Sequence, residues 1–76
     1  MGGKKVYRYP VIIERARKNY SAYSPDLPGC VATGETIKET ITRMRTAIKY
    51  HLEGLRKEGC DIQEPSTKIK YLEISI

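Results

Sequence analysis

Three short stretches of the N-terminal half are rich in apolar, β-branched and aromatic residues and are bounded by polar, proline or glycine residues, which predicts β-strands. Residues 6–14 are dominated by β-branched and aromatic side chains, which favour strand structure. Residues 20–24 and 30–33 predict two further short strands, and the polar stretch 15–19 suits a hairpin loop between the first two. Pro10 has no N–H to donate to a sheet, so we expect the first strand at an edge or at a bulge.

The spacing of apolar residues then changes to three and four, which predicts one amphipathic helix. Thr36 and Glu39 fit a capping box, in which each side chain accepts from the other residue's backbone N–H. Gly59 suits a left-handed C-terminal cap. Gly54 lies inside the helix at a cost of about 1 kcal/mol relative to Ala, and we expect it to mark close approach by another backbone. The apolar stripe consists of Ile37, Ile41, Met44, Ala47, Ile48, Leu52 and Leu55.

The chain ends on a stretch in which polar and apolar residues alternate, 68–76, and this predicts a final strand. Its two faces are Leu72, Ile74 and Ile76 on one side and Tyr71, Glu73 and Ser75 on the other. The predicted fold class is therefore α+β: a β-β-β-α-β two-layer sandwich, with an antiparallel sheet covered by one long helix and the last strand returning to a sheet edge. We expect one domain over residues 1–76, with residues 1–5 flexible.

Length and composition limit what such a domain can do. The chain has 76 residues, 30% of them charged, with a formal net charge of +5. No apolar run approaches the roughly 20 residues of a membrane span. Cys30 and Cys60 are too few for a disulfide framework of the secreted kind. We therefore expect a cytoplasmic protein.

Residues that could carry catalysis or bind a metal do not cluster in the sequence. His51 is the single histidine, and it projects about 40° from the apolar stripe. It is either a partly buried core or interface histidine, or a metal ligand or acid–base group. Cys30 is either a small buried hydrophobic residue or an exposed thiol with no base identified beside it. The carboxylates considered as magnesium ligands are Glu14, Asp26, Glu39 and Glu53. These patterns do not favour an enzyme, and we expect no metal and no cofactor.

Four basic residues form the clearest candidate contact surface. Lys38, Arg45, Lys49 and Arg56 fall within about 40° of one another on a helical projection. Such a basic row could meet phosphates or an acidic partner, and the alternative is an ordinary solvated helix face. A helix-turn-helix would require a second helix of adequate length, which the pattern does not predict.

Tyrosine is the only aromatic residue type in the chain. Tyr7, Tyr9, Tyr20 and Tyr23 lie on the first two predicted strands. Tyrosine buries area while keeping a polar tip, which suits either the cover of a small core or a protein interface. A domain this small gains from burying further surface, so we expect a homodimer or higher homo-oligomer.

Four sequence motifs resemble the HicB-like antitoxin family. They are Tyr-Pro-Val-Ile-Ile-Glu at 9–14, the run from Tyr20 through Pro-Asp-Leu-Pro-Gly-Cys to Gly34, Ala-Ile-Lys-Tyr-His-Leu-Glu-Gly-Leu at 47–55, and Ile-Gln-Glu-Pro-Ser at 62–66. The resemblance covers nearly the whole chain from Tyr9 onward. The combination of Pro-Asp-Leu-Pro-Gly-Cys with Leu-Glu-Gly-Leu at this distance is fairly specific.

The resemblance implies a partial ribonuclease-H-like fold without a working catalytic set. It also implies binding and inhibition of HicA-type toxins, small ribonucleases that cleave mRNA and have a double-stranded-RNA-binding-like fold. Many members also carry a C-terminal DNA-binding domain. The sequence shown stops at Ile76, so direct operator binding is not expected of it.

The net charge leaves three interpretations open, because an acidic surface suits a basic toxin better than a +5 chain does. The interface is locally acidic, the partner is unusual, or this short form acts differently. The leading hypothesis is an antitoxin that covers the ribonuclease site of a HicA-like protein. The alternative is a small basic module that binds RNA or another nucleic acid without catalysis. A residual nuclease rests on fold analogy alone.

Overall fold

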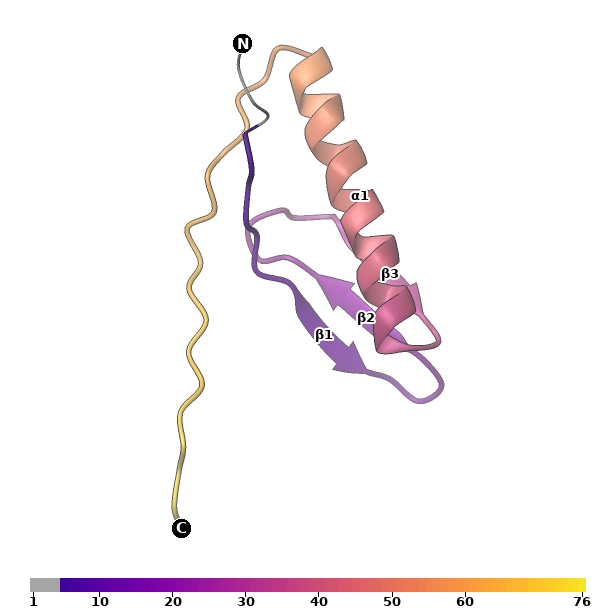
Figure 1. The fold of residues 1–76 in the computed structure, drawn as a ribbon, viewed down its shortest axis with the longest axis vertical. Helices are drawn as coiled ribbons and strands as arrows, with labels where there is room; N and C mark the ends of the chain where they lie inside the picture. The colour runs from indigo at the N-terminus through magenta and orange to yellow at the C-terminus, as the bar shows by residue number, and fades with distance from the viewer. Residues whose placement is uncertain (1–4) are drawn as a thin grey trace.

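A computed structural model describes residues 5–76 of the chain. Three strands, β1 (Ile12–Arg15), β2 (Tyr20–Tyr23) and β3 (Val31–Gly34), precede one helix, α1 (Ile37–Lys57). Figure 1 shows the helix lying across one face of a small sheet. This arrangement confirms the predicted α+β class. The predicted flexibility of residues 1–5 falls outside the described residues except at Lys5, and it stays a prediction.

The sheet is antiparallel in the order β1-β2-β3, so β1 and β3 are its edges. Ile13 lies opposite Ala22, and Ala22 opposite Ala32. The first strand begins at Ile12 rather than at the predicted residue 6. Pro10 explains the late start, since it cannot donate a ladder hydrogen bond.

Local hydrogen bonds fix the start of α1. The Glu39 N–H donates to the Thr36 hydroxyl oxygen at 3.0 Å, as the capping box requires. The Glu39 carboxylate, however, accepts from the N–H of Glu35 at 2.8 Å rather than from that of Thr36. The Thr36 cap is therefore confirmed. The predicted return contact of Glu39 is wrong, because its donor is Glu35 rather than Thr36.

The end of α1 also follows the sequence. Gly59 has a φ of +74°, the left-handed conformation that glycine adopts without strain. The Cys60 N–H donates to the Leu55 carbonyl at 2.9 Å, which closes the last turn. Gly54 is different, because a Cβ added there would meet nothing within 4 Å. The predicted close approach at Gly54 is therefore wrong within the described chain.

The core lies between α1 and the strands β2 and β3. Met44 of the helix, Ala22 of β2, and Leu27 and Cys30 of the β2–β3 loop are buried together. Thr40 is fully buried, and its hydroxyl donates to the Thr36 carbonyl at 2.7 Å. Partly buried side chains surround this cluster: Tyr9, Val11, Ile13, Ala32, Ala47, Ile48 and Leu52.

The predicted final strand does not join the sheet. Residues 68–76 are extended, but they form no strand with any other part of residues 5–76. In Figure 1 this C-terminal segment runs beside the body without lying along β1. The last element of the predicted β-β-β-α-β order is therefore wrong for the single chain. Hydrogen bonds to the β2–β3 loop, described below, anchor residues 66–67, and the chain leaves the body from there.

The described part of the chain holds no helix whose length and apolar character would let it cross a lipid bilayer.

Candidate functional site

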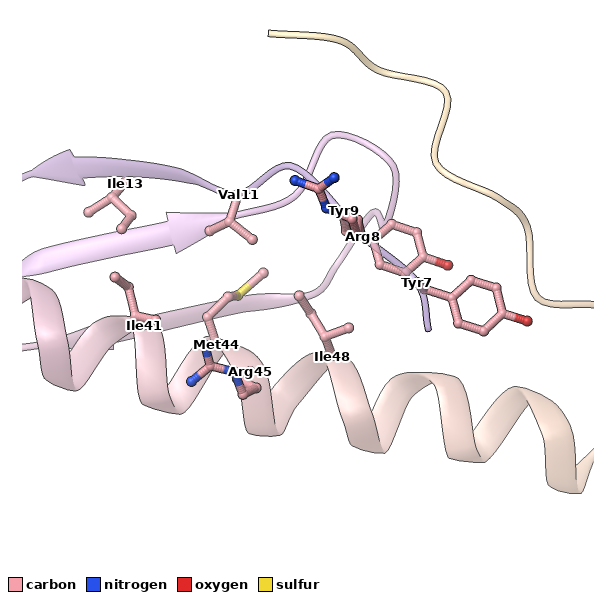
Figure 2. A pocket seen from close by; sticks show the side chains of 9 residues that line it. All are labelled: Tyr7, Arg8, Tyr9, Val11, Ile13, Ile41, Met44, Arg45 and Ile48. Atoms are coloured by element: carbon pink, nitrogen blue, oxygen red, sulfur yellow. The ribbon is translucent and has the colours of Figure 1, made fainter. Parts of the chain in front are cut away.

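An apolar groove lies between α1 and the first strand. Its volume is about 490 Å³. It forms because α1 packs on β3 and β2, so the side chains of β1 and of the residues before it are covered only in part. Figure 2 shows the β1-side residues facing the helix residues across it. The lining consists of Tyr7, Arg8, Tyr9, Val11 and Ile13 on one side and Ile41, Met44, Arg45 and Ile48 on the other.

Two tyrosines form one end of the groove. The rings of Tyr7 and Tyr9 stack with centroids 6.1 Å apart and planes at 13°. The Lys5 ammonium lies 5.2 Å from the Tyr7 ring centroid, within cation–π range. The Tyr9 hydroxyl donates to the Gln63 carbonyl at 2.7 Å. Desolvation is the main cause that raises the pKa of Tyr9, with the nearby Tyr7 adding to it.

The four predicted interface tyrosines do not form one surface. Tyr7 and Tyr9 come together in the groove. Tyr20 is half-buried in β2, on the same strand face as Ala22 and therefore toward the helix. Tyr23 lies on the opposite face of β2 and is 38% exposed. Their role in an interface stays a prediction.

The face of the sheet opposite α1 is partly exposed among the described residues. Ile12, Tyr23 and Val31 lie side by side across its three strands. Val31 is 63% exposed. The remaining strand positions on this outer face are Glu14, Ser21 and Thr33, because strand side chains alternate. The outer face thus carries one acidic and no basic strand residue, although the chain has a net charge of +5.

The basic row lies on one continuous helix, as its spacing predicted. Lys38, Arg45, Lys49 and Arg56 are all exposed on α1. From first to last they span about 27 Å, at 1.5 Å per residue. None of the ion pairs found among residues 5–76 involves them, and Arg45 borders the groove. The row is therefore available to a partner, and its function stays a prediction.

Asp26 has a role that sequence reasoning missed. Its Oδ1 accepts from the N–H and hydroxyl of Ser66 at 3.0 and 3.1 Å. It also accepts from the N–H and hydroxyl of Thr67 at 3.3 and 3.2 Å. These bonds, above all the one from the Ser66 N–H, lower the pKa of Asp26. Paired donors such as Ser66-Thr67 are visible in a sequence, but an acceptor forty residues away is not.

The remaining candidates have structural or solvated positions. Cys30 is buried, and burial raises the pKa of its thiol, which suits a packing residue rather than a nucleophile. Cys60 is exposed, and neither cysteine forms a disulfide. His51 is half-buried, while Glu14 and Glu53 are exposed. Within residues 5–76, no three His, Cys, Asp or Glu side chains converge in a way that could hold a metal ion.

Comparison with known proteins identifies the family to which the chain belongs. Residues 9–74 match the family described as the HicB-like antitoxin of bacterial toxin–antitoxin systems. An "uncharacterized 14.9 kDa protein in rep-hol intergenic region" of Haemophilus phage HP1 is 30% identical over 64 residues, which are 84% of this chain and 48% of that protein. The chain thus spans about half the length of the phage relative.

A second relative is the "UPF0150 protein Ta0767" of Thermoplasma acidophilum. It is 37% identical over 53 residues, which are 68% of this chain and 77% of that protein. No solved structure matches significantly. The family match extends over most of the chain, including the three strands, the helix and the residues that Asp26 anchors. This chain belongs to the HicB-like antitoxins of bacterial toxin–antitoxin systems.

Proposed function

We propose that this chain acts in the cytoplasm as an antitoxin that binds and neutralises a HicA-like, mRNA-cleaving toxin. The observation that carries the proposal is the family match over residues 9–74. Membership in an antitoxin family suggests a regulatory protein that acts by binding rather than by catalysis. The surfaces described above support this function, since they offer exposed apolar and aromatic area that a protein partner can cover.

The outer face of the sheet is the surface we propose for the toxin. Tyr23 and Val31 supply exposed aromatic and aliphatic area, the kind that anchors protein interfaces. Glu14 gives this face a local negative charge within a basic chain. A face with one acidic and no basic strand residue suits a basic ribonuclease better than the net charge of +5 suggests.

The test is inhibition of mRNA cleavage by a purified HicA-like ribonuclease from the same genome. We expect this chain to abolish cleavage near equimolar ratio. Tyr23→Lys is expected to weaken inhibition about 10- to 100-fold, the range for one central interface residue. Tyr50→Lys is the matched control, because Tyr50 is 70% exposed on α1, away from the outer face. This variant should inhibit the toxin as well as the unmodified protein does.

Two results would contradict this proposal at different levels. If no complex forms at about 10 µM, an affinity too weak for an antitoxin, the function itself is wrong. If inhibition is intact but Tyr23→Lys and Tyr50→Lys behave alike, the function stands and the assignment of the outer face is wrong. Thermal unfolding of both variants checks that each is folded.

Nucleic-acid binding is the second candidate function, and the basic row favours it. Four exposed cations along about 27 Å of one helix could follow a phosphate backbone. Filter binding to RNA at two salt concentrations gives the slope of the logarithm of the binding constant against the logarithm of the salt concentration. The magnitude of this slope should fall when Arg45, Lys49 and Arg56 are changed to Gln. The matched control makes the same charge change in the β1–β2 loop, at Arg15, Arg17 and Lys18. Absence of binding at low salt would exclude this function.

A further inference from the structure

The C-terminal segment, residues 68–76, has the side-chain pattern of a buried strand but the exposure of a free one. Leu72 is 80% exposed and Ile74 75% exposed, and Ile76 is fully exposed. These three share one face of the extended segment, since strand side chains alternate. Monomeric proteins seldom leave a contiguous row of large aliphatic side chains in water.

The accessible surface and the radius of gyration are both larger than those of a compact monomer of this size. The accessible surface is 6809 Å², whereas a compact monomer of this mass exposes roughly 4,700 Å². Fully exposing the four residues outside the described range would account for only about 600 Å² of the difference. The radius of gyration is 14.7 Å, against about 11.4 Å expected for a compact domain of this length. The excess is therefore larger than the roughly 800 Å² per partner of a standard interface.

The body of the molecule lacks one strand at a matching place. Among residues 5–76, β1 pairs with β2 on one side and with no strand on the other, so the backbone groups of that second edge are open to pairing. Beside it lies the groove, in which Val11 and Ile13 face Ile41 and Ile48 (Figure 2). A strand added along this edge would direct every second side chain into the groove. A segment with three aliphatic side chains on one face meets this requirement.

The chain's own segment is directed elsewhere. Asp26 holds Ser66 and Thr67 on the β2–β3 loop, and the Tyr9 hydroxyl holds Gln63. Beyond Thr67 the segment leaves the body without returning to β1 (Figure 1), and the closer view also shows it outside the groove (Figure 2). At about 3.3 Å per residue, its nine residues extend roughly 30 Å. This length is enough to reach along a strand of a neighbouring molecule.

We propose that two copies of this chain exchange their C-terminal segments. Residues 68–76 of each copy pair with the free edge of β1 in the other, and Leu72, Ile74 and Ile76 fill that copy's groove. A second copy is the occupant because each chain provides one groove and one free strand, so a twofold exchange satisfies both and leaves no open end. The predicted fourth strand then forms between molecules, and the predicted homodimer acquires a defined interface.

Sedimentation equilibrium of the full chain gives the first test. The unmodified protein is expected to be a dimer. The double variant Leu72→Lys, Ile74→Lys should raise the dissociation constant by at least about 100-fold, because two buried anchors become charged. The control, Tyr71→Lys, Ser75→Lys, adds the same charge to the same segment on its opposite face and should dissociate as the unmodified protein does. A strictly monomeric unmodified protein would overturn the proposal, and so would a control as monomeric as the test variant.

A mixed-label NMR sample gives the second test. Equal amounts of isotope-labelled and unlabelled chain are unfolded, refolded together and examined by filtered NOE spectroscopy. We expect contacts between copies that join the methyl groups of Leu72 and Ile74 to those of Val11, Ile41 and Ile48. The same contacts confined to one copy would show that the segment closes on its own β1, and contacts only between two segments would show pairing without exchange. Either result would overturn the proposal, and neither bears on toxin inhibition.

Discussion

Gly34 sits where β3 turns into the N-terminus of α1, and it leaves no room for a side chain. A Cβ built there would lie 2.7 Å from the Thr40 hydroxyl oxygen and 2.9 Å from the Thr40 backbone nitrogen. Thr40 cannot turn away easily, because it is fully buried and its hydroxyl donates to the Thr36 carbonyl at 2.7 Å. Gly34→Ala should therefore force the strand and the helix apart.

Two opposing effects set how much Gly34→Ala changes the free energy of unfolding. Overpacking of a filled site destabilises by about 1–3 kcal/mol. Alanine restricts the unfolded chain more than glycine does, which offsets roughly 0.5–1 kcal/mol. We expect Gly34→Ala to lower the free energy of unfolding by about 1–2 kcal/mol. For a domain of this size, that lowers the midpoint of thermal unfolding by roughly 5–15 °C.

Gly54→Ala is the matched control. It makes the same change inside α1, where an added Cβ meets nothing within 4 Å. Its expected effect has the opposite sign, a gain of about 1 kcal/mol from helix propensity and a rise of roughly 4–8 °C. Circular dichroism measures both melting curves at one protein concentration, since exchange between copies would make the midpoint concentration-dependent.

A Gly34→Ala protein that melts at or above the unmodified midpoint would refute the packing of β3 against α1. A Gly54→Ala protein that melts lower would show that something does approach Gly54, as the sequence had suggested.

Three further expectations are checked by simple measurements. Thr36→Ala removes the N-cap acceptor and should lower the free energy of unfolding by about 1 kcal/mol, measured by urea denaturation. With a thiol reagent under native conditions, Cys60 should react rapidly and Cys30 only on unfolding, and a Cys60→Ser protein that still labels rapidly would contradict the burial of Cys30. Since Asp26 has a lowered pKa, its ionised form stabilises the fold above the ordinary value of 3.8, and this contribution is lost as pH falls through the lowered pKa. The difference in melting temperature between the unmodified protein and Asp26→Ala should accordingly be constant near neutral pH and shrink in acid, and a difference that grows in acid would refute the anchoring of Ser66.

Local interactions explain why most elements could be predicted. The Thr36 cap, the Gly59 terminus and the apolar stripe of α1 depend on residues within a few positions of one another. The three strands could also be predicted from their local residue content. Their antiparallel pairing in chain order was expected because short connections join consecutive strands. Two details were wrong. A Cβ added at Gly54 would meet nothing within 4 Å, so the expected close approach is absent from the described chain. The Glu39 carboxylate accepts from the N–H of Glu35, one residue before the expected donor.

The candidate site was only partly predictable, for a physical reason of the same kind. The basic row was visible because one helix carries all four residues. The groove was not, because its two walls are brought together only when α1 packs over β2 and β3 and leaves β1 partly open. The outer face required the strand register, which places Ile12, Tyr23 and Val31 side by side.

The sequence by itself determined the α+β class, the bounds of the helix to within a residue or two, and membership in the HicB-like antitoxins, since these depend on local patterns and on short motifs along the chain. Tertiary structure alone decided where residues 68–76 go. Their alternation specifies a strand, but a strand is completed by an edge to pair with and a groove to fill. The hydrogen bonds from Ser66 and Thr67 to Asp26, forty residues earlier in the chain, direct that segment away from its own sheet.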